Sequence, residues 1–192
     1  TNDFFGESFT NNINDRVTLE NFKTSLGVKY QNNVLGELMF ALNYNNINYG
    51  YDSVVLFPNQ VIPNRIKTDF FGAEASYFKS FGKFNIKGNG GVNLSEEFVG
   101  SYLNGNISLS VFDDIKFNAG INISSRLPNY NYLLYQSDYV DFNWYNLNSF
   151  KNINTQQLSF SIRSQKWFDA DFDISNIDNY TYFNLETPVD NE

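Results

Sequence analysis

The feature of this sequence that most constrains its fold is a repeated alternation of apolar and polar residues, broken by connections of alternating length. A period of two residues is typical of β-strands with one apolar and one polar face. The alternation predicts eight strands, at residues 16–30, 34–46, 65–79, 83–95, 100–112, 115–126, 153–164 and 166–176, with long loops at 47–64 and 127–152. Connections that are short on one side and long on the other are typical of outer-membrane barrels. We therefore expect an all-β, transmembrane antiparallel β-barrel with an up-and-down meander.

The length of the predicted strands separates this fold from its main alternative, a soluble β-sandwich. In the stretch 100–112, Leu103, Ile107, Leu109 and Val111 alternate with asparagine and serine, and the stretch 115–126 repeats the scheme. Strands of this length match the roughly 9–11 residues that a tilted strand needs to cross a bilayer, whereas sandwich strands are usually about 5–6 residues long. Strand length therefore favours the barrel.

Composition removes several classes of function. The chain has no histidine and no cysteine, and its formal net charge is -8. Hydrolase triads that depend on histidine and most zinc sites are excluded, and attraction to nucleic acid is disfavoured. No run of apolar residues is long enough for a transmembrane helix, and the first residues, TNDFF, lack the order of a signal peptide. We expect no enzyme activity, no cofactor, no metal site and no nucleic-acid partner.

Charged residues recur at the polar positions of the predicted strands, where we expect them to line a lumen. They are Lys23, Glu37, Glu74, Lys87, Lys116, Arg126, Arg163, Asp169, Asp171 and Asp173. Charges of both signs in one lumen create a transverse field that filters solutes, although a polar wall without selectivity would carry similar charges. The three aspartates lie on an extended stretch, which cannot wrap around calcium as a binding loop does, so we assign them to the lumen wall.

Aromatic residues mark two further regions. Seven of them lie near the tight turns, as expected of an interfacial girdle: Tyr30, Tyr77, Phe81, Phe84, Phe112, Trp167 and Phe168. The stretch 65–79 also places Phe70 and Phe78 on its otherwise polar face, and a slip of one residue there would exchange the two faces.

The loop sequence RLPNYNYLLYQSDYVDFNWYN, residues 126–146, is too aromatic for a passive connection. We call it the aromatic segment. Its candidate functional side chains are Tyr130, Tyr132, Tyr135, Tyr139 and Trp144. The segment either folds inward or binds the faces of sugars.

This segment, continued by KNINTQQLSF and QKWFDADFDISNIDNYTYF, resembles the putative porin family of Bacteroidota outer-membrane β-barrels, most clearly over residues 118–183. The resemblance implies a location in the bacterial outer membrane, in contact with its lipid, and a barrel with more than eight strands. The chain would then be an internal segment of a larger barrel, although eight strands alone can also close. Asp52, Ser53 and Val54 match the short O-glycosylation pattern of this phylum, which makes Ser53 a candidate modification site.

Three functions remain open. The first is a porin-like channel for passive diffusion of small hydrophilic solutes, favoured by the asparagine and serine of the polar face. The second is a non-conducting barrel subunit of an outer-membrane transport or secretion complex, with other outer-membrane proteins as partners, favoured if the aromatic segment plugs the lumen. The third is a surface β-sandwich adhesin or glycan-binding module. Fold alone does not separate the first two, because function lies in the lumen and the loops.

Overall fold

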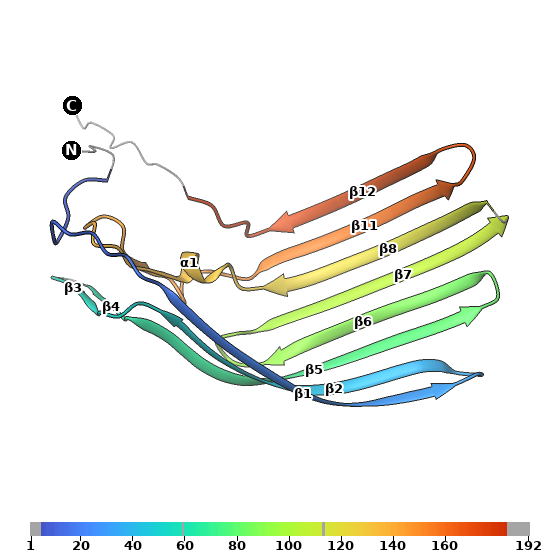
Figure 1. Ribbon diagram of the computed structural model, residues 1–192, viewed down its shortest axis with the longest axis horizontal. Coiled ribbons are helices and arrows are strands. Elements are labelled where there is room, and N and C mark those ends of the chain that lie inside the picture. Colours follow the sequence, from blue (N-terminus) through green and yellow to red (C-terminus); the bar gives the residue numbers. More distant parts are fainter. Residues whose placement is uncertain (1–4, 59, 113, 184–192) are drawn as a thin grey trace.

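The computed structural model describes residues 5–58, 60–112 and 114–183, and most of them belong to one antiparallel sheet (Figure 1). The eight strands of this sheet follow the order β1-β2-β5-β6-β7-β8-β11-β12, so each pairs with the next long strand along the chain. Their bounds are β1 Thr18–Asn32, β2 Gly36–Gly50, β5 Arg65–Phe81, β6 Phe84–Leu94, β7 Gly100–Phe112, β8 Ile115–Arg126, β11 Ile153–Ser164 and β12 Asp169–Asp178. The predicted meander of eight strands is confirmed.

Two strand boundaries differ from the predicted ones by more than two residues. Strand β2 continues to Gly50, because Ile47 and Tyr49 extend its alternation and are buried on the polar face. The rest of that predicted loop contains the hairpin of β3 (Val55–Phe57) and β4 (Gln60–Ile62). Strand β12 starts later than expected, since the Ser164 hydroxyl accepts hydrogen bonds from the backbone N–H groups of residues 166 and 167 and holds them in a turn.

The sheet is open in the described part of the chain. There, β1 pairs only with β2 and β12 pairs only with β11. The expectation of a closed barrel is therefore not met, and the alternative of eight strands that close on themselves is wrong for the described residues. A β-sandwich is not formed there either, because the only other sheets have two strands each. They are the pair β3–β4 and the pair of β9 (Leu134–Tyr135) and β10 (Trp144–Tyr145).

One face of the sheet is apolar and uncovered across all eight strands. The register places Leu26 opposite Leu42 and Phe160 opposite Phe172, so large apolar side chains from neighbouring strands adjoin one another. Its exposed members include Phe22, Leu26, Val28, Phe40, Leu42, Phe71, Val92, Leu103, Ile107, Leu109, Phe117, Ile121, Leu158, Phe160, Phe172 and Ile174. An apolar face of this extent marks a surface that contacts lipid or protein.

This apolar face has a boundary at each end. Toward the long loops, the same face carries the register pairs Asn46–Asp69 and Ser101–Ser125, and Asn154 lies beside Ser125. Toward the tight turns it ends in aromatic side chains, and of the predicted girdle Tyr30, Phe81, Trp167 and Phe168 are exposed. Tyr77 and Phe84 are half-buried, and the side chain of Phe112 lies outside the described residues. The face is thus a band with a polar rim on one side and an aromatic rim on the other.

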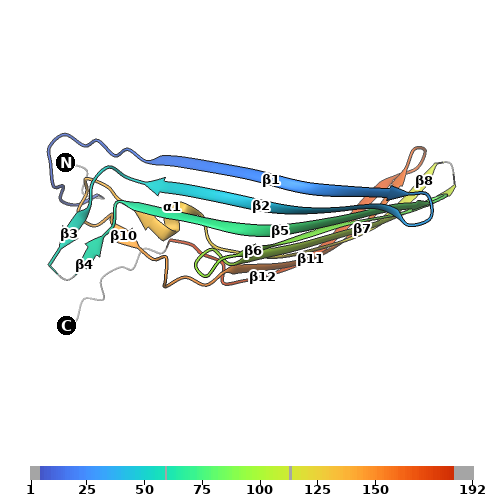
Figure 2. The ribbon, with the colours of Figure 1, turned by 90° about the horizontal axis from the view of Figure 1, so that it is seen from below.

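The buried core lies at the long-loop end, on the opposite face of the sheet. It is built around the aromatic segment, which folds into the helix α1 (Tyr130–Leu133) and the short strands β9 (Leu134–Tyr135) and β10 (Trp144–Tyr145). Figures 1 and 2 together show that the sheet is curved and that α1 lies on the inside of the curve. Within the described residues, no helix has the length and apolar character needed to span a membrane.

Candidate functional site

The ten charged side chains expected in a lumen all project from the same face of the sheet, opposite the apolar band. The register links them strand by strand: Asn106 of β7 lies opposite both Lys87 and Gly120, and Ser159 lies opposite both Gly120 and Asp173. The inside of the curved sheet is therefore lined by these charges: Lys23, Glu37, Glu74, Lys87, Lys116, Arg126, Arg163, Asp169, Asp171 and Asp173.

Half of these charges are neutralised by close partners. Lys23 Nζ lies 2.8 Å from Glu74 Oε1, so this ion pair reaches across β2. Lys29 Nζ lies 2.8 Å from Glu37 Oε2, and Arg163 pairs with Asp171. These partly exposed pairs contribute little to stability, and their effect here is on the local field.

The other five charges have no ion pair within the described residues. The cations lie on the central strands, with Lys87 on β6 and Lys116 and Arg126 on β8. The anions Asp169 and Asp173 lie on β12, at one edge of the sheet. The uncompensated field on this face therefore runs from the centre of the sheet toward β12.

Neutral polar side chains fill the space between the charges and bond across strands. The Asn122 amide donates to Asn104 Oδ1, and Asn118 Nδ2 donates to Ser161 Oγ at 3.0 Å. Ser25 Oγ donates to Asn43 Oδ1 at 2.6 Å. Such a surface can form hydrogen bonds with water, which the apolar band on the opposite face cannot do.

The aromatic segment crosses this polar face at its long-loop end. It follows β8, yet it is fixed to β2 and to the residues that precede β5. Tyr49 Oη donates to the Leu134 carbonyl at 3.2 Å, and Gln136 Nε2 donates to the Pro63 carbonyl at 2.8 Å. Leu133 and Leu134 are completely buried. The segment therefore folds inward, the first of the two outcomes that its composition suggested.

The five candidate aromatic side chains of this segment do not form a single surface. Tyr130 stacks on Tyr49 with ring centroids 5.1 Å apart. Tyr135 stacks on Trp144 at 4.6 Å. Tyr132 and Trp144 both contact Phe183, and Tyr139 contacts Phe5 and Phe142. Only Tyr130 and Tyr135 face the sheet, and the others bind this segment to the two ends of the described chain.

The sheet contributes apolar side chains that the sequence analysis did not assign to the site. These are Ile47, Tyr49, Ile66 and Phe70, together with Phe98 from the connection between β6 and β7. Phe70 had made the face assignment of its strand ambiguous. It is buried on the polar face, stacked on Phe98 with ring centroids 5.9 Å apart, and so belongs to this cluster. Apolar residues at strand positions that face the polar side are the sequence signal that could have identified a patch covered by another part of the chain.

Burial also changes the chemistry of the tyrosines at this end. Loss of solvent raises the pKa of Tyr51, Tyr130 and Tyr135 above the ordinary value. For Tyr51 and Tyr135, the charge of Asp15 adds to this increase in pKa. Their hydroxyl groups therefore remain protonated and uncharged at neutral pH. The described residues contain no cluster of acidic or other ligating side chains that could hold a metal ion.

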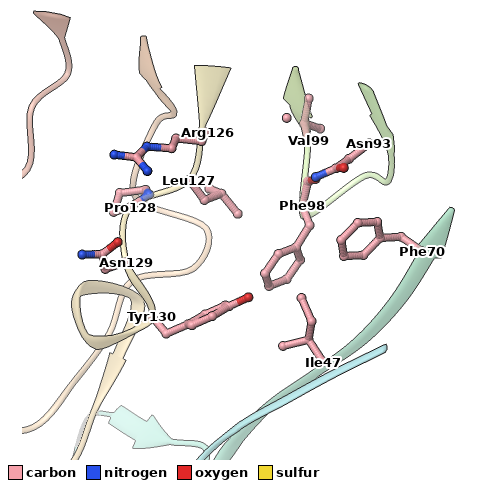
Figure 3. Close-up of a pocket in the computed structure, with 11 residues that line it drawn as sticks. Ile47, Phe70, Asn93, Phe98, Val99, Arg126, Leu127, Pro128, Asn129 and Tyr130 are labelled. Carbon is pink, nitrogen blue, oxygen red and sulfur yellow. The ribbon is translucent and has the colours of Figure 1, made fainter. Parts of the chain in front are cut away.

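A cavity of about 360 Å³ remains between the start of the aromatic segment and the sheet (Figure 3). Ile47, Phe70 and Phe98 line it on the sheet side, and Tyr130 lines it from α1. Figure 3 shows the Tyr130 hydroxyl directed toward the space between Phe98 and Ile47. This volume lies at the low end of the roughly 300–1,000 Å³ that is typical of sites for small molecules. The aromatic segment thus narrows the space over the polar face without filling it.

Comparison with known proteins adds a family to this architecture. A family model described as putative porin matches residues 1–190. No curated protein and no solved structure matches the chain. The resemblance noted for residues 118–183 is confirmed and extends over nearly the whole sequence. A porin requires a wall of this kind, a curved meander with one apolar and one polar face. The chain belongs to the putative porin family.

Proposed function

We propose that this chain forms part of the wall of an outer-membrane channel through which small hydrophilic solutes diffuse passively. The observation that carries the proposal is the division of one sheet into an uncovered apolar band and a face lined by charged and neutral polar side chains. A membrane-spanning sheet needs apolar side chains toward lipid and can be polar toward its lumen. Membership of the putative porin family supports the same role at a coarse level.

The two free edges of the sheet bear on how such a wall is completed. Backbone N–H and C=O groups that face hydrocarbon without partners are costly, so spanning sheets close into barrels. In the described residues, β1 and β12 each have one neighbour only. We propose that further strands pair with these edges and complete a larger barrel in the bacterial outer membrane.

Site-directed spin labelling tests the proposal directly, because the chain contains no cysteine. Single cysteines would be placed along β7 in the membrane-embedded protein and labelled. Collision with lipid-soluble oxygen would then be compared with collision with a water-soluble nickel complex. We expect labels at Leu103, Ile107 and Leu109 to meet oxygen, and labels at Asn104 and Asn106 to meet nickel. Odd positions that are shielded from oxygen would refute a membrane wall.

A second candidate function is a non-conducting barrel that serves as a subunit of an outer-membrane transport or secretion complex. The inward position of the aromatic segment favours this second function, because Leu133 and Leu134 are completely buried against the polar face. The same labels distinguish the two candidates. Labels at Asn104 and Asn106 that meet neither reagent would indicate a plugged lumen, and reconstituted protein would then fail to make liposomes permeable to sugars.

A further inference from the structure

The segment that precedes β1 lies against the aromatic segment, although more than half of the chain separates them. The Phe9 N–H donates to the Asp138 carbonyl at 2.8 Å, and the Val140 N–H donates to the Glu7 carbonyl at 2.9 Å. Between these two bonds, Ser8 and Tyr139 form an isolated antiparallel bridge. We call residues 5–15 the N-terminal strap. It pairs with the aromatic segment in the manner of an additional short strand.

Asp15 provides the strongest attachment of this strap. Its Oδ1 accepts a hydrogen bond from the Asp138 N–H at 2.7 Å, and its Oδ2 accepts one from the Ser137 hydroxyl at 2.6 Å. In return, the Asn14 N–H donates to Asp138 Oδ2 at 2.7 Å. Hydrogen bonds to a carboxylate are shorter and stronger than those between neutral groups. Because Asp15 lies three residues before Thr18, the first residue of β1, these bonds join the aromatic segment to the first strand of the wall.

Ring contacts reinforce the attachment along the rest of the strap. Phe5 lies 5.0 Å from Tyr139 and 5.6 Å from Phe142, measured between ring centroids. Phe9 lies 6.0 Å from Phe57 of β3. The aromatic segment is thus held by β2 through Tyr49, by the Pro63 carbonyl through Gln136, and by the strap through Asp15.

We propose that Asp15 is a positioning residue that holds the aromatic segment across the long-loop end of the polar face, and that this position sets the upper size of solute that passes. The inference rests on the proposed channel function. Without the bonds of Asp15, the anchors at Tyr49 and Gln136 remain, but the part of the segment beyond Gln136 keeps only the bond from Asn14 and the backbone and ring contacts of the strap. A segment with fewer anchors opens locally more often.

The matched pair of variants is Asp15→Ala and Glu7→Ala. Both remove one carboxylate from the strap, but the Glu7 side chain is exposed and only its backbone carbonyl takes part in the pairing. Hydrogen exchange of residues 130–147 measures the opening of the aromatic segment. Swelling of liposomes in sugars of increasing length measures the size limit. In Asp15→Ala we expect exchange faster by about tenfold and entry of longer sugars than in the wild type, with neither change in Glu7→Ala.

A reversible cross-link provides a second test, in which oxidation and reduction compare the held and the released segment in one and the same protein. Ser8→Cys with Tyr139→Cys places two thiols at the isolated bridge in a chain without other cysteines. In the background of Asp15→Ala, the oxidised pair should restore the wild-type size limit, and reduction should abolish it again. Faster exchange with an unchanged size limit would overturn this inference alone. Absence of swelling in every variant, with exchange still faster in Asp15→Ala, would overturn the channel function and this inference with it.

Discussion

Replacement of Ile107 by arginine tests the membrane orientation of the sheet more directly than any other single change. Ile107 lies in the middle of β7, opposite Ile86 and Ala119 on the apolar band, and its side chain is 44% exposed. If water covers this face, an exposed substitution changes stability by about 0.5 kcal/mol or less. If lipid covers it, arginine near the bilayer midplane costs about 2–4 kcal/mol. The two environments therefore predict clearly different losses for one variant.

Two control variants of Ile107→Arg isolate face and depth. Asn106 is the preceding residue on the polar face, and Asn106→Arg removes a hydrogen bond to the Ala119 carbonyl, so it should cost about 0.5–1 kcal/mol. Ser101 lies at the polar rim of the apolar band, where arginine should cost about 0–1 kcal/mol. Unfolding by guanidinium in phospholipid vesicles, followed by the fluorescence of the two tryptophans, yields all three values. Equal losses at residues 106 and 107, or no loss at 107, would refute the assignment of the faces.

Three other predictions concern the long-loop end. Leu134→Ala should destabilise the protein by about 2–5 kcal/mol, because Leu134 is 0% exposed. Its control is Leu26→Ala on the apolar band, which should cost less than about 1 kcal/mol. Both values come from the same unfolding assay. Arg65 donates hydrogen bonds to β1, to β2 and to the residue after β2. Arg65→Ala should therefore cost about 2 kcal/mol in guanidinium unfolding, with only part recovered by lysine, which lacks the planar fork of donors. Burial raises the pKa of Tyr51 and Tyr130, so the folded protein keeps protons that the unfolded chain releases. The contribution of these two tyrosines to the free energy of unfolding should be complete below about pH 10 and should decline as the pH rises further. Unfolding measured at a series of alkaline pH values, together with the absorbance of tyrosinate, checks this prediction.

The division of the sheet into two faces could be predicted from the sequence because it depends on local alternation. Leu103 and Asn104 take opposite faces whatever the rest of the chain does, since successive side chains of a strand point to opposite sides. Pairing of consecutive strands follows from the short turns. The same rules placed the predicted lumen charges on one face without any knowledge of long-range contacts.

The contacts that cover the polar face could not be predicted in this way. Tyr49 and Leu134 meet across 85 positions of sequence, and Asp15 meets Asp138 across 123. No local pattern encodes such pairs. The sequence marked Phe70 as an aromatic residue on an otherwise polar face, whereas Ile47 and Tyr49 fell in the predicted loop 47–64, and nothing in the sequence identified the residues that cover them.

The wall and the aromatic segment are held by different kinds of interaction, and this difference has a consequence for function. The wall is held by backbone pairing between eight strands. The position of the segment depends on a buried cluster and a few side-chain bonds, from Tyr49, Gln136 and Asp15. Under the proposed channel function, we expect substitutions at these residues to alter which solutes pass while the backbone pairing of the wall stays intact. If the proposal is correct, the permeability of the channel and the stability of its wall depend on different sets of residues.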